Sequence, residues 1–98
     1  MTLEIKRSTG EATIKVVGRL DRFTAPVLEK TIDQLASGAS GIVLDMSGLE
    51  QISDTGVKVL LGAHEKLKES GALRLTGVGE SIMETLRANG GADVLAIS

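Results

Sequence analysis

Apolar and polar residues alternate along the first part of the chain with a period of two, which is typical of half-exposed β-strands. One alternating run covers residues 3–7 and a second covers residues 11–16. Gly10 lies between the two runs and predicts a turn, so the pattern favours a β-hairpin. Gly18 is expected to end the second strand.

The pattern then changes to helical spacing. Apolar residues recur three and four positions apart over residues 28–35, which predicts an amphipathic helix. We expect Thr24 to be its N-cap and Pro26 to lie in its first turn. The apolar run 42–44 predicts a strand buried on both faces. A second helix is expected to begin near residues 53–55.

The last third of the chain repeats this alternation. A strand is predicted over 73–76, a short helix around 82–86 and an edge strand within 94–97. The order β-β-α-β-α-β-α-(β) predicts an α/β fold with a mixed sheet and right-handed crossovers. Its 98 residues suit a single domain, which we expect to span residues 1–98.

Composition narrows the location and the chemistry. The chain is 42% hydrophobic and 24% charged, with no apolar run of about 18 residues that could span a membrane. The N-terminal residues mix charge with apolar side chains, unlike a signal peptide. Cysteine is absent, which excludes disulfides and zinc–thiolate sites. We therefore expect a cytoplasmic protein.

Several function classes are excluded by what the chain lacks. A net charge of −2 and a single aromatic residue, Phe23, argue against nucleic-acid binding. The single histidine, His64, cannot form a multi-histidine metal site. The sequence pattern also places no serine or cysteine nucleophile beside it, as a catalytic histidine would need. We expect no enzyme activity, no catalytic residues, no metal and no cofactor.

Two motifs carry a resemblance to a known family. Residues 43–56 read VLDMSGLEQISDTG, and residues 18–21 read GRLD. The chain resembles the STAS domain of bacterial anti-sigma-factor antagonists, in which a buried strand of the type V-L-D-L-S is followed by D-S-[ST]-G at a helix start. G-x-L-D after the second strand is similar too. The resemblance implies the STAS fold, with the helices packed mainly on one side of the sheet.

The resemblance also implies a function. Such domains bind a serine kinase that acts as an anti-sigma factor, and this binding frees the sigma factor. Phosphorylation of the serine after the aspartate breaks the complex, and a serine phosphatase restores it. We therefore expect a partner-switching regulator of transcription whose partner is an anti-sigma serine kinase, with no nucleic acid or membrane bound by the chain itself.

The phosphoacceptor region, Ser53 to Gly56, departs from the family pattern. The acceptor serine falls on Asp54, so a carboxylate stands where phosphorylation is expected. Three hypotheses follow: Asp54 fixes a state that is partly like the phosphorylated one, Ser53 or Thr55 has become the acceptor, or Asp54 only caps the helix.

The resemblance further implies partner contacts beside this region. The loop after the second strand supplies Asp21, Arg22 and Thr24, and the second helix supplies Lys58 and Leu61. A plain turn is the simpler interpretation of the loop, with Phe23 tucked into the core. Leu61, like Val57, lies at the border of the apolar stripe, and packing is its simpler interpretation.

Two alternative functions stay open. The chain could be a STAS scaffold subunit of a larger signalling assembly, in which case a homo-oligomer is expected. It could also be a weak nucleotide-sensing module, because Gly77 and Gly79 lie between a strand and a helix. The third glycine of the dinucleotide fingerprint is replaced by Ile82, so a turn is the simpler interpretation.

Overall fold

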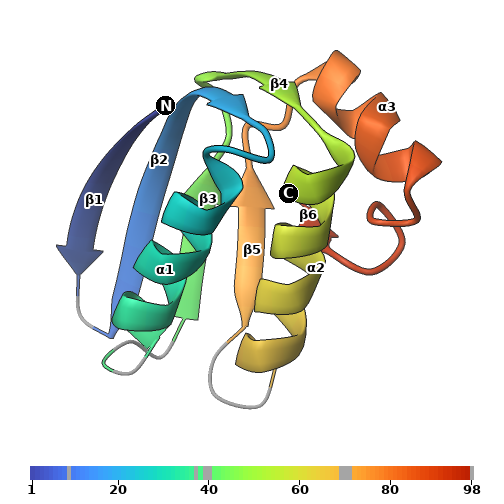
Figure 1. The fold of residues 1–98 in the computed structure, drawn as a ribbon. Helices are drawn as coiled ribbons and strands as arrows, with labels where there is room; N and C mark the ends of the chain where they lie inside the picture. Colours follow the sequence, from blue (N-terminus) through green and yellow to red (C-terminus); the bar gives the residue numbers. More distant parts are fainter. Residues whose placement is uncertain (9, 37, 39–40, 69–71, 98) are drawn as a thin grey trace.

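The structure is a computed structural model that describes residues 1–8, 10–36, 38, 41–68 and 72–97. The chain begins with a β-hairpin, after which helices alternate with strands, with two consecutive strands before the second helix (Figure 1). Their bounds are β1 Thr2–Ser8, β2 Glu11–Leu20, α1 Ala25–Ala36, β3 Gly41–Asp45, β4 Leu49–Ile52, α2 Asp54–Leu67, β5 Leu73–Thr76, α3 Glu80–Ala88 and β6 Ala96–Ile97.

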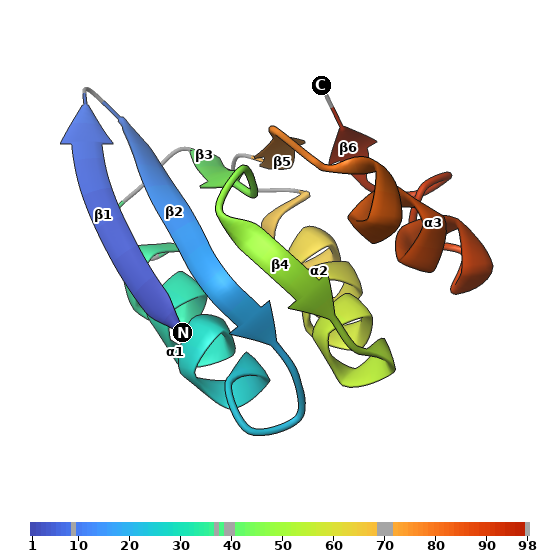
Figure 2. The ribbon, with the colours of Figure 1, turned by 90° about the horizontal axis from the view of Figure 1, so that it is seen from above.

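The strands form one mixed sheet in the order β1-β2-β3-β5-β6, with β4 paired to the far end of β2. β1 is antiparallel to β2, as the predicted hairpin requires. The remaining pairs along this order are parallel: β2 with β3, β3 with β5, and β5 with β6. β1 forms one edge of the sheet and the two-residue β6 the other (Figure 2). The predicted α/β class with a mixed sheet is confirmed.

β2 continues beyond the position where it was expected to stop. Gly18 has a φ of +105°, which only glycine adopts without strain, and the strand passes through it to Leu20. The pairing register with β4 shifts between Gly18 and Arg19, as at a β-bulge. The bulge re-aims the end of β2 toward β4, so the prediction that Gly18 ends the strand was wrong.

β4 was not predicted at all. Its ends, Leu49 and Ile52, are buried, whereas Glu50 and Gln51 between them are exposed. This pattern does not alternate with a period of two, and four residues are too few to show a period. The strand is specified by pairing with β2, which is a contact between residues far apart in the sequence.

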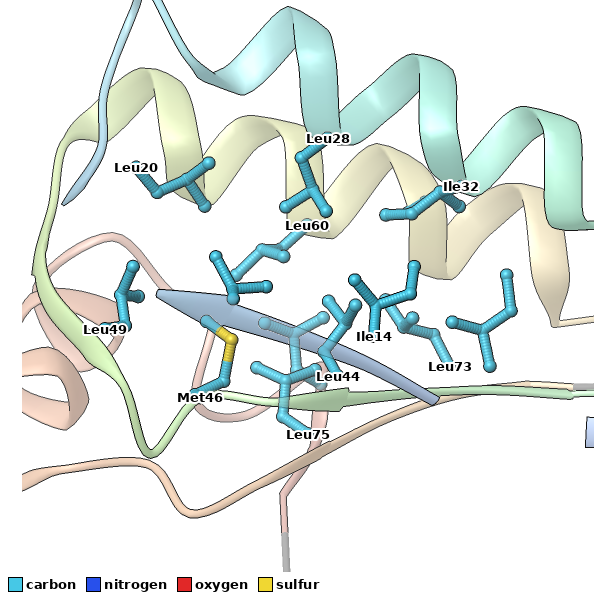
Figure 3. Close-up of a cluster of buried hydrophobic side chains, with 14 of the residues drawn as sticks. Ile14, Leu20, Leu28, Ile32, Leu44, Met46, Leu49, Leu60, Leu73 and Leu75 are labelled. Carbon is cyan, nitrogen blue, oxygen red and sulfur yellow. The ribbon is translucent and has the colours of Figure 1, made fainter. Parts of the chain in front are cut away.

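The hydrophobic core fills the space between the sheet and the helices α1 and α2 (Figure 3). Figure 2 shows these two helices side by side beneath the sheet, whereas α3 lies beyond β4. Ile42, Val43 and Leu44 of β3 are at most 9% exposed, which confirms the strand buried on both faces. Fully buried side chains in the core include Ile14, Leu20, Leu28, Ile32, Leu44, Leu60, Leu73 and Leu75.

Candidate functional site

Two segments far apart in the sequence meet at the N-terminal ends of α1 and α2. Residues 21–23, after β2, and residues 53–55, at the start of α2, line one hollow of ≈ 380 Å³. The backbone fixes this arrangement, because the N–H of Ser53 donates to the carbonyl oxygen of Leu20 at 2.9 Å. The pairing of β4 with β2 therefore delivers both segments to one place.

The loop after β2 is held by its first residue, Asp21. Its carboxylate accepts hydrogen bonds from the backbone N–H groups of Phe23, at 2.9 Å, and Thr24, at 3.0 Å. The N–H groups of Thr24 and then Phe23 favour the charged form and hold the pKa of Asp21 below its ordinary value of 3.8. These bonds close the loop as an Asx-type turn.

Thr24 does not use its hydroxyl as the predicted helix cap. The hydroxyl donates to the carbonyl oxygen of Arg19 at 2.8 Å and accepts from the N–H of Asp21 at 2.9 Å. These bonds close the loop back onto the end of β2. Thr24 still directly precedes α1, which begins at Ala25, so its position was correct and its bonding was not.

Phe23 is exposed, which corrects the expectation that it packs in the core. Its side chain is 73% exposed, and the guanidinium of Arg22 lies 4.8 Å from the centre of its ring. The Asp21 turn fixes the backbone at Phe23 and points its side chain outward, and the guanidinium gains a cation–π contact there. The D-x-x-T spacing that makes the turn was visible in the sequence, but its effect on Phe23 was not.

Ser53, and not Asp54, caps α2. Ser53 has extended backbone angles (φ −96°, ψ 171°), and its hydroxyl oxygen accepts from the N–H of Gly56 at 3.2 Å. Asp54 is the first residue of the helix and is exposed. The hypothesis that Asp54 caps the helix was therefore wrong, because Ser53 is the cap. Asp54 instead places a negative charge in the first turn, where the helix dipole favours one.

The two hydroxyl groups beside Asp54 differ in accessibility. Ser53 is half-buried and its oxygen is engaged in the cap, whereas Thr55 is exposed on the first turn of α2. Both line the hollow together with Asp54. Of these two side chains, Thr55 is the one that solvent or a partner reaches without disturbing the helix start.

Gly56 allows the close approach that joins the segments. A Cβ atom at this position would lie 2.9 Å from the carbonyl oxygen of Leu20 and 2.9 Å from Cγ1 of Ile52. Both distances are shorter than real Cβ contacts, and one neighbour is backbone that cannot rotate away. The glycine of the motif is therefore required where α2 meets the end of β2.

The other predicted residues of α2 lie along one stripe. Lys58 and Leu61 follow Asp54 by four and seven residues, so helical geometry places the three side chains on one face. Lys58 is exposed, whereas Leu61 is half-buried and packs against the core. Val57, expected at the border of the stripe, is 1% exposed and belongs to the core.

Asp45 and the glycine loop before α3 form a separate cluster. The Asp45 carboxylate accepts from the hydroxyl of Ser47 at 2.7 Å and from its N–H at 3.0 Å. These bonds, the hydroxyl first, lower the pKa of Asp45. A Cβ on Gly77 would lie 3.0 Å from Cβ of Ser47, and Gly77 has a φ of +65°. Gly77 is thus explained by turn geometry and close packing.

Three further features concern possible metal ligands, the single histidine and membrane-spanning helices in the part of the chain that the structure describes. Among those residues no group of three or more His, Cys, Asp or Glu side chains could hold a metal ion. His64 is half-exposed, and its buried Nδ1 has no hydrogen-bond partner. Within the same residues no helix is long and apolar enough to cross a membrane.

Comparison with known proteins identifies the family. Residues 3–96 match the family model described as "Mlab, STAS domain", so the chain belongs to the STAS domain family. It is similar to the anti-sigma-B factor antagonist of Bacillus subtilis (strain 168), with 22% identity over all of this chain and 91% of that protein.

Two mycobacterial proteins are similar as well. The anti-sigma-F factor antagonist RsfB of Mycobacterium tuberculosis (strain ATCC 25618 / H37Rv) is 30% identical over 71% of this chain and 58% of its own length. The crystal structure of an anti-sigma factor antagonist from Mycobacterium paratuberculosis matches with a TM-score of 0.87 and 25% identity, covering 98% of this chain and 83% of that one. The expected resemblance to anti-sigma-factor antagonists is confirmed.

Proposed function

We propose that this chain is an anti-sigma-factor antagonist that binds an anti-sigma serine kinase and is not itself an enzyme. The names of its relatives support the regulatory class. The observation that carries the proposal is Phe23, the one aromatic residue of the sequence, which is 73% exposed beside the start of α2. The partner is a cytoplasmic protein of the same bacterium.

The docking surface consists of Asp21, Arg22, Phe23, Asp54 and Thr55, which line the hollow. Aromatic residues and arginine, here Phe23 beside Arg22, are the residue types that protein interfaces favour at their energetic centre. The Asp21 turn holds the backbone at Phe23 in place, so little backbone freedom is lost there on binding. Lys58, on the stripe that follows Asp54, extends this surface, with Leu61 at its inner border and Thr24 supporting the loop.

Thr55 is the residue that we assign as the phosphoacceptor. The kinase would transfer the γ-phosphoryl group of ATP to the Thr55 hydroxyl oxygen, releasing ADP and the hydroxyl proton. The phosphate adds about −1.5 to −2 charges beside Asp54. The helix N-terminus tolerates this charge, whereas a kinase surface matched to one carboxylate would not. A serine phosphatase would hydrolyse the ester and restore binding.

Phe23→Ala tests the docking surface. We expect the variant to bind the cognate anti-sigma kinase roughly 30-fold more weakly, because hot-spot aromatic residues dominate interface affinity. Its melting temperature should stay within a few degrees of the parent, because the ring is mostly exposed. Titration calorimetry with the purified kinase measures the affinity. Val94→Ala is the control, because Val94 is also an exposed apolar residue, at 47%, outside the docking surface.

The phosphoacceptor assignment is tested in the same system by intact mass and site mapping after incubation with kinase and ATP. One phosphoryl group on Thr55, lost in Thr55→Ala, is expected. Phosphate on Ser53 would overturn the assignment while leaving the docking proposal intact. No phosphorylation by an active kinase that still binds would indicate that Asp54 fixes the state. Equal binding of parent and Phe23→Ala would contradict the docking proposal itself.

A further inference from the structure

The outer edge of β1 is the longest unpaired strand edge of the sheet that the described residues form. β1 has seven residues and pairs with β2 on one side, and nothing in the described chain covers its other side (Figure 1). Its outward N–H and C=O groups are therefore a template for another strand. The opposite edge, β6, has two residues and offers far less pairing.

Apolar surface accompanies this edge. Ile5 lies opposite Ile14 of β2, which is fully buried, so Ile5 points to the face of the sheet that the helices cover. It is nevertheless 47% exposed, because it lies at the rim of the core. A strand added to β1 would cover Ile5 and extend the core.

We propose that the occupant of this edge is a second copy of the chain, paired antiparallel through β1 about Ile5. A two-fold axis at Ile5, perpendicular to the sheet, sets Ile5 against its own copy and pairs all seven residues of the strand. It also places Glu4 of each copy opposite Lys6 of the other, on the open face of the sheet. Opposite charges directly across a strand pair stabilise it.

The neighbouring registers are disfavoured by the same charges. Centring the axis on Glu4 or Lys6 would set each charge against its own copy, and like charges directly opposite destabilise a pair. A shift of one residue would turn one copy's helices to the other face and expose Ile5 on the wrong side. Charged residues on edge strands normally prevent association, but here one register makes them complementary.

The proposal is independent of the kinase, and sedimentation equilibrium of the purified full chain tests it. The interface is smaller than the standard size for stable complexes, so we expect a dissociation constant on the order of 100 µM. Lys6→Glu should raise it at least tenfold, because glutamates would then face each other at two places. Lys6 lies opposite Thr13 within the hairpin, so the monomer should fold normally, which a melting curve checks.

Matched variants make the outcome specific. Lys30→Glu causes the same change of net charge at an exposed position of α1 and should leave dimerisation unchanged. Glu4→Lys with Lys6→Glu exchanges the charge pairs between the copies, and Lys15→Glu is added because Glu4 lies opposite Lys15 within the hairpin. This triple variant should restore dimerisation to within about threefold of the parent. Hydrogen exchange should show β1 amides more protected at high than at low protein concentration. A monomer at every concentration up to about 1 mM would overturn the proposal. A dimer that Lys6→Glu and Lys30→Glu weaken equally would overturn it as well.

Discussion

Gly56 shows how one residue can hold a functional site together. Its missing side chain lets α2 start against the carbonyl oxygen of Leu20, which also accepts the N–H of Ser53. The docking surface therefore depends on a buried position that does not line the hollow. Gly62 lies in the same helix and offers the opposite case, because a Cβ atom added there would meet nothing within 4 Å.

The pair predicts opposite effects of one substitution. Gly56→Ala should lower the free energy of unfolding by about 1–3 kcal/mol, because the added methyl group must displace backbone. Gly62→Ala should raise it by about 0.5–1 kcal/mol, because alanine loses less entropy than glycine in a helix. Urea unfolding followed by far-UV circular dichroism measures both, since the chain has no tryptophan. Similar values for the two variants would show that the close contact is not rigid.

For single residues, the sequence predicted the place along the helices and loops better than the contacts of the side chain. The motif located Gly56, Asp54 and Thr55 correctly at the start of α2. It could not reveal that Ser53 is the cap, because serine and aspartate are equally good N-caps and only the backbone angles decide. Phe23 was misplaced for a related reason: an aromatic residue usually packs inside, and only the geometry of the Asp21 turn points it outward.

The elements were predictable where their period is long enough to read. α1, α2 and β1 carry clear repeats and form where the repeats place them, and β2 begins where its repeat begins but continues to Leu20. β4 has four residues and gains its identity from pairing with β2, so no local pattern could predict it. The same pairing aligns the β2–α1 loop with α2, which means that the unpredicted strand positions the predicted site.

The β2–α1 loop should depend on pH through Asp21. The folded state lowers the pKa of this carboxyl below its ordinary 3.8, through the N–H groups of Thr24 and Phe23. A lowered folded pKa means that the stabilisation is present above about pH 4 and is lost as pH falls through the folded value. Asp21→Asn should therefore be less stable than the parent near neutral pH, with the difference shrinking as the pH falls through the lowered pKa of the folded state.

Urea unfolding curves of parent and variant at several pH values between about 3 and 7 measure that difference. Asp93→Asn, at an exposed position near the C-terminus, makes the same charge change away from the loop and is the control. If both variants respond to pH alike, the hydrogen bonds of the Asp21 turn do not contribute to stability.

For the whole molecule, the sheet order places β3 at the centre, between two neighbouring strands, and places β1 and β6 at the edges, with one neighbouring strand each. β3 lies between β2 and β5, and its apolar residues are buried by the helices on one face and nearly buried on the other. The docking surface lies at the N-terminal ends of α1 and α2, while the proposed dimer edge lies along β1. Because these surfaces differ, kinase binding and self-association need not exclude each other.

This arrangement predicts a gradient of amide hydrogen exchange across the sheet. Amides of Ile42 and Leu44 should exchange most slowly, through global unfolding, because β3 is the central strand of the sheet and both side chains are buried in the core. Among the strand amides that face a neighbouring strand, those of β6 should exchange fastest, since β6 has only two residues and one neighbour. Exchange followed by NMR on dilute protein, below the dimerisation range, measures the order. Equal protection of β3 and β6 would mean that the sheet opens as one unit and that its edges are no more adaptable than its centre.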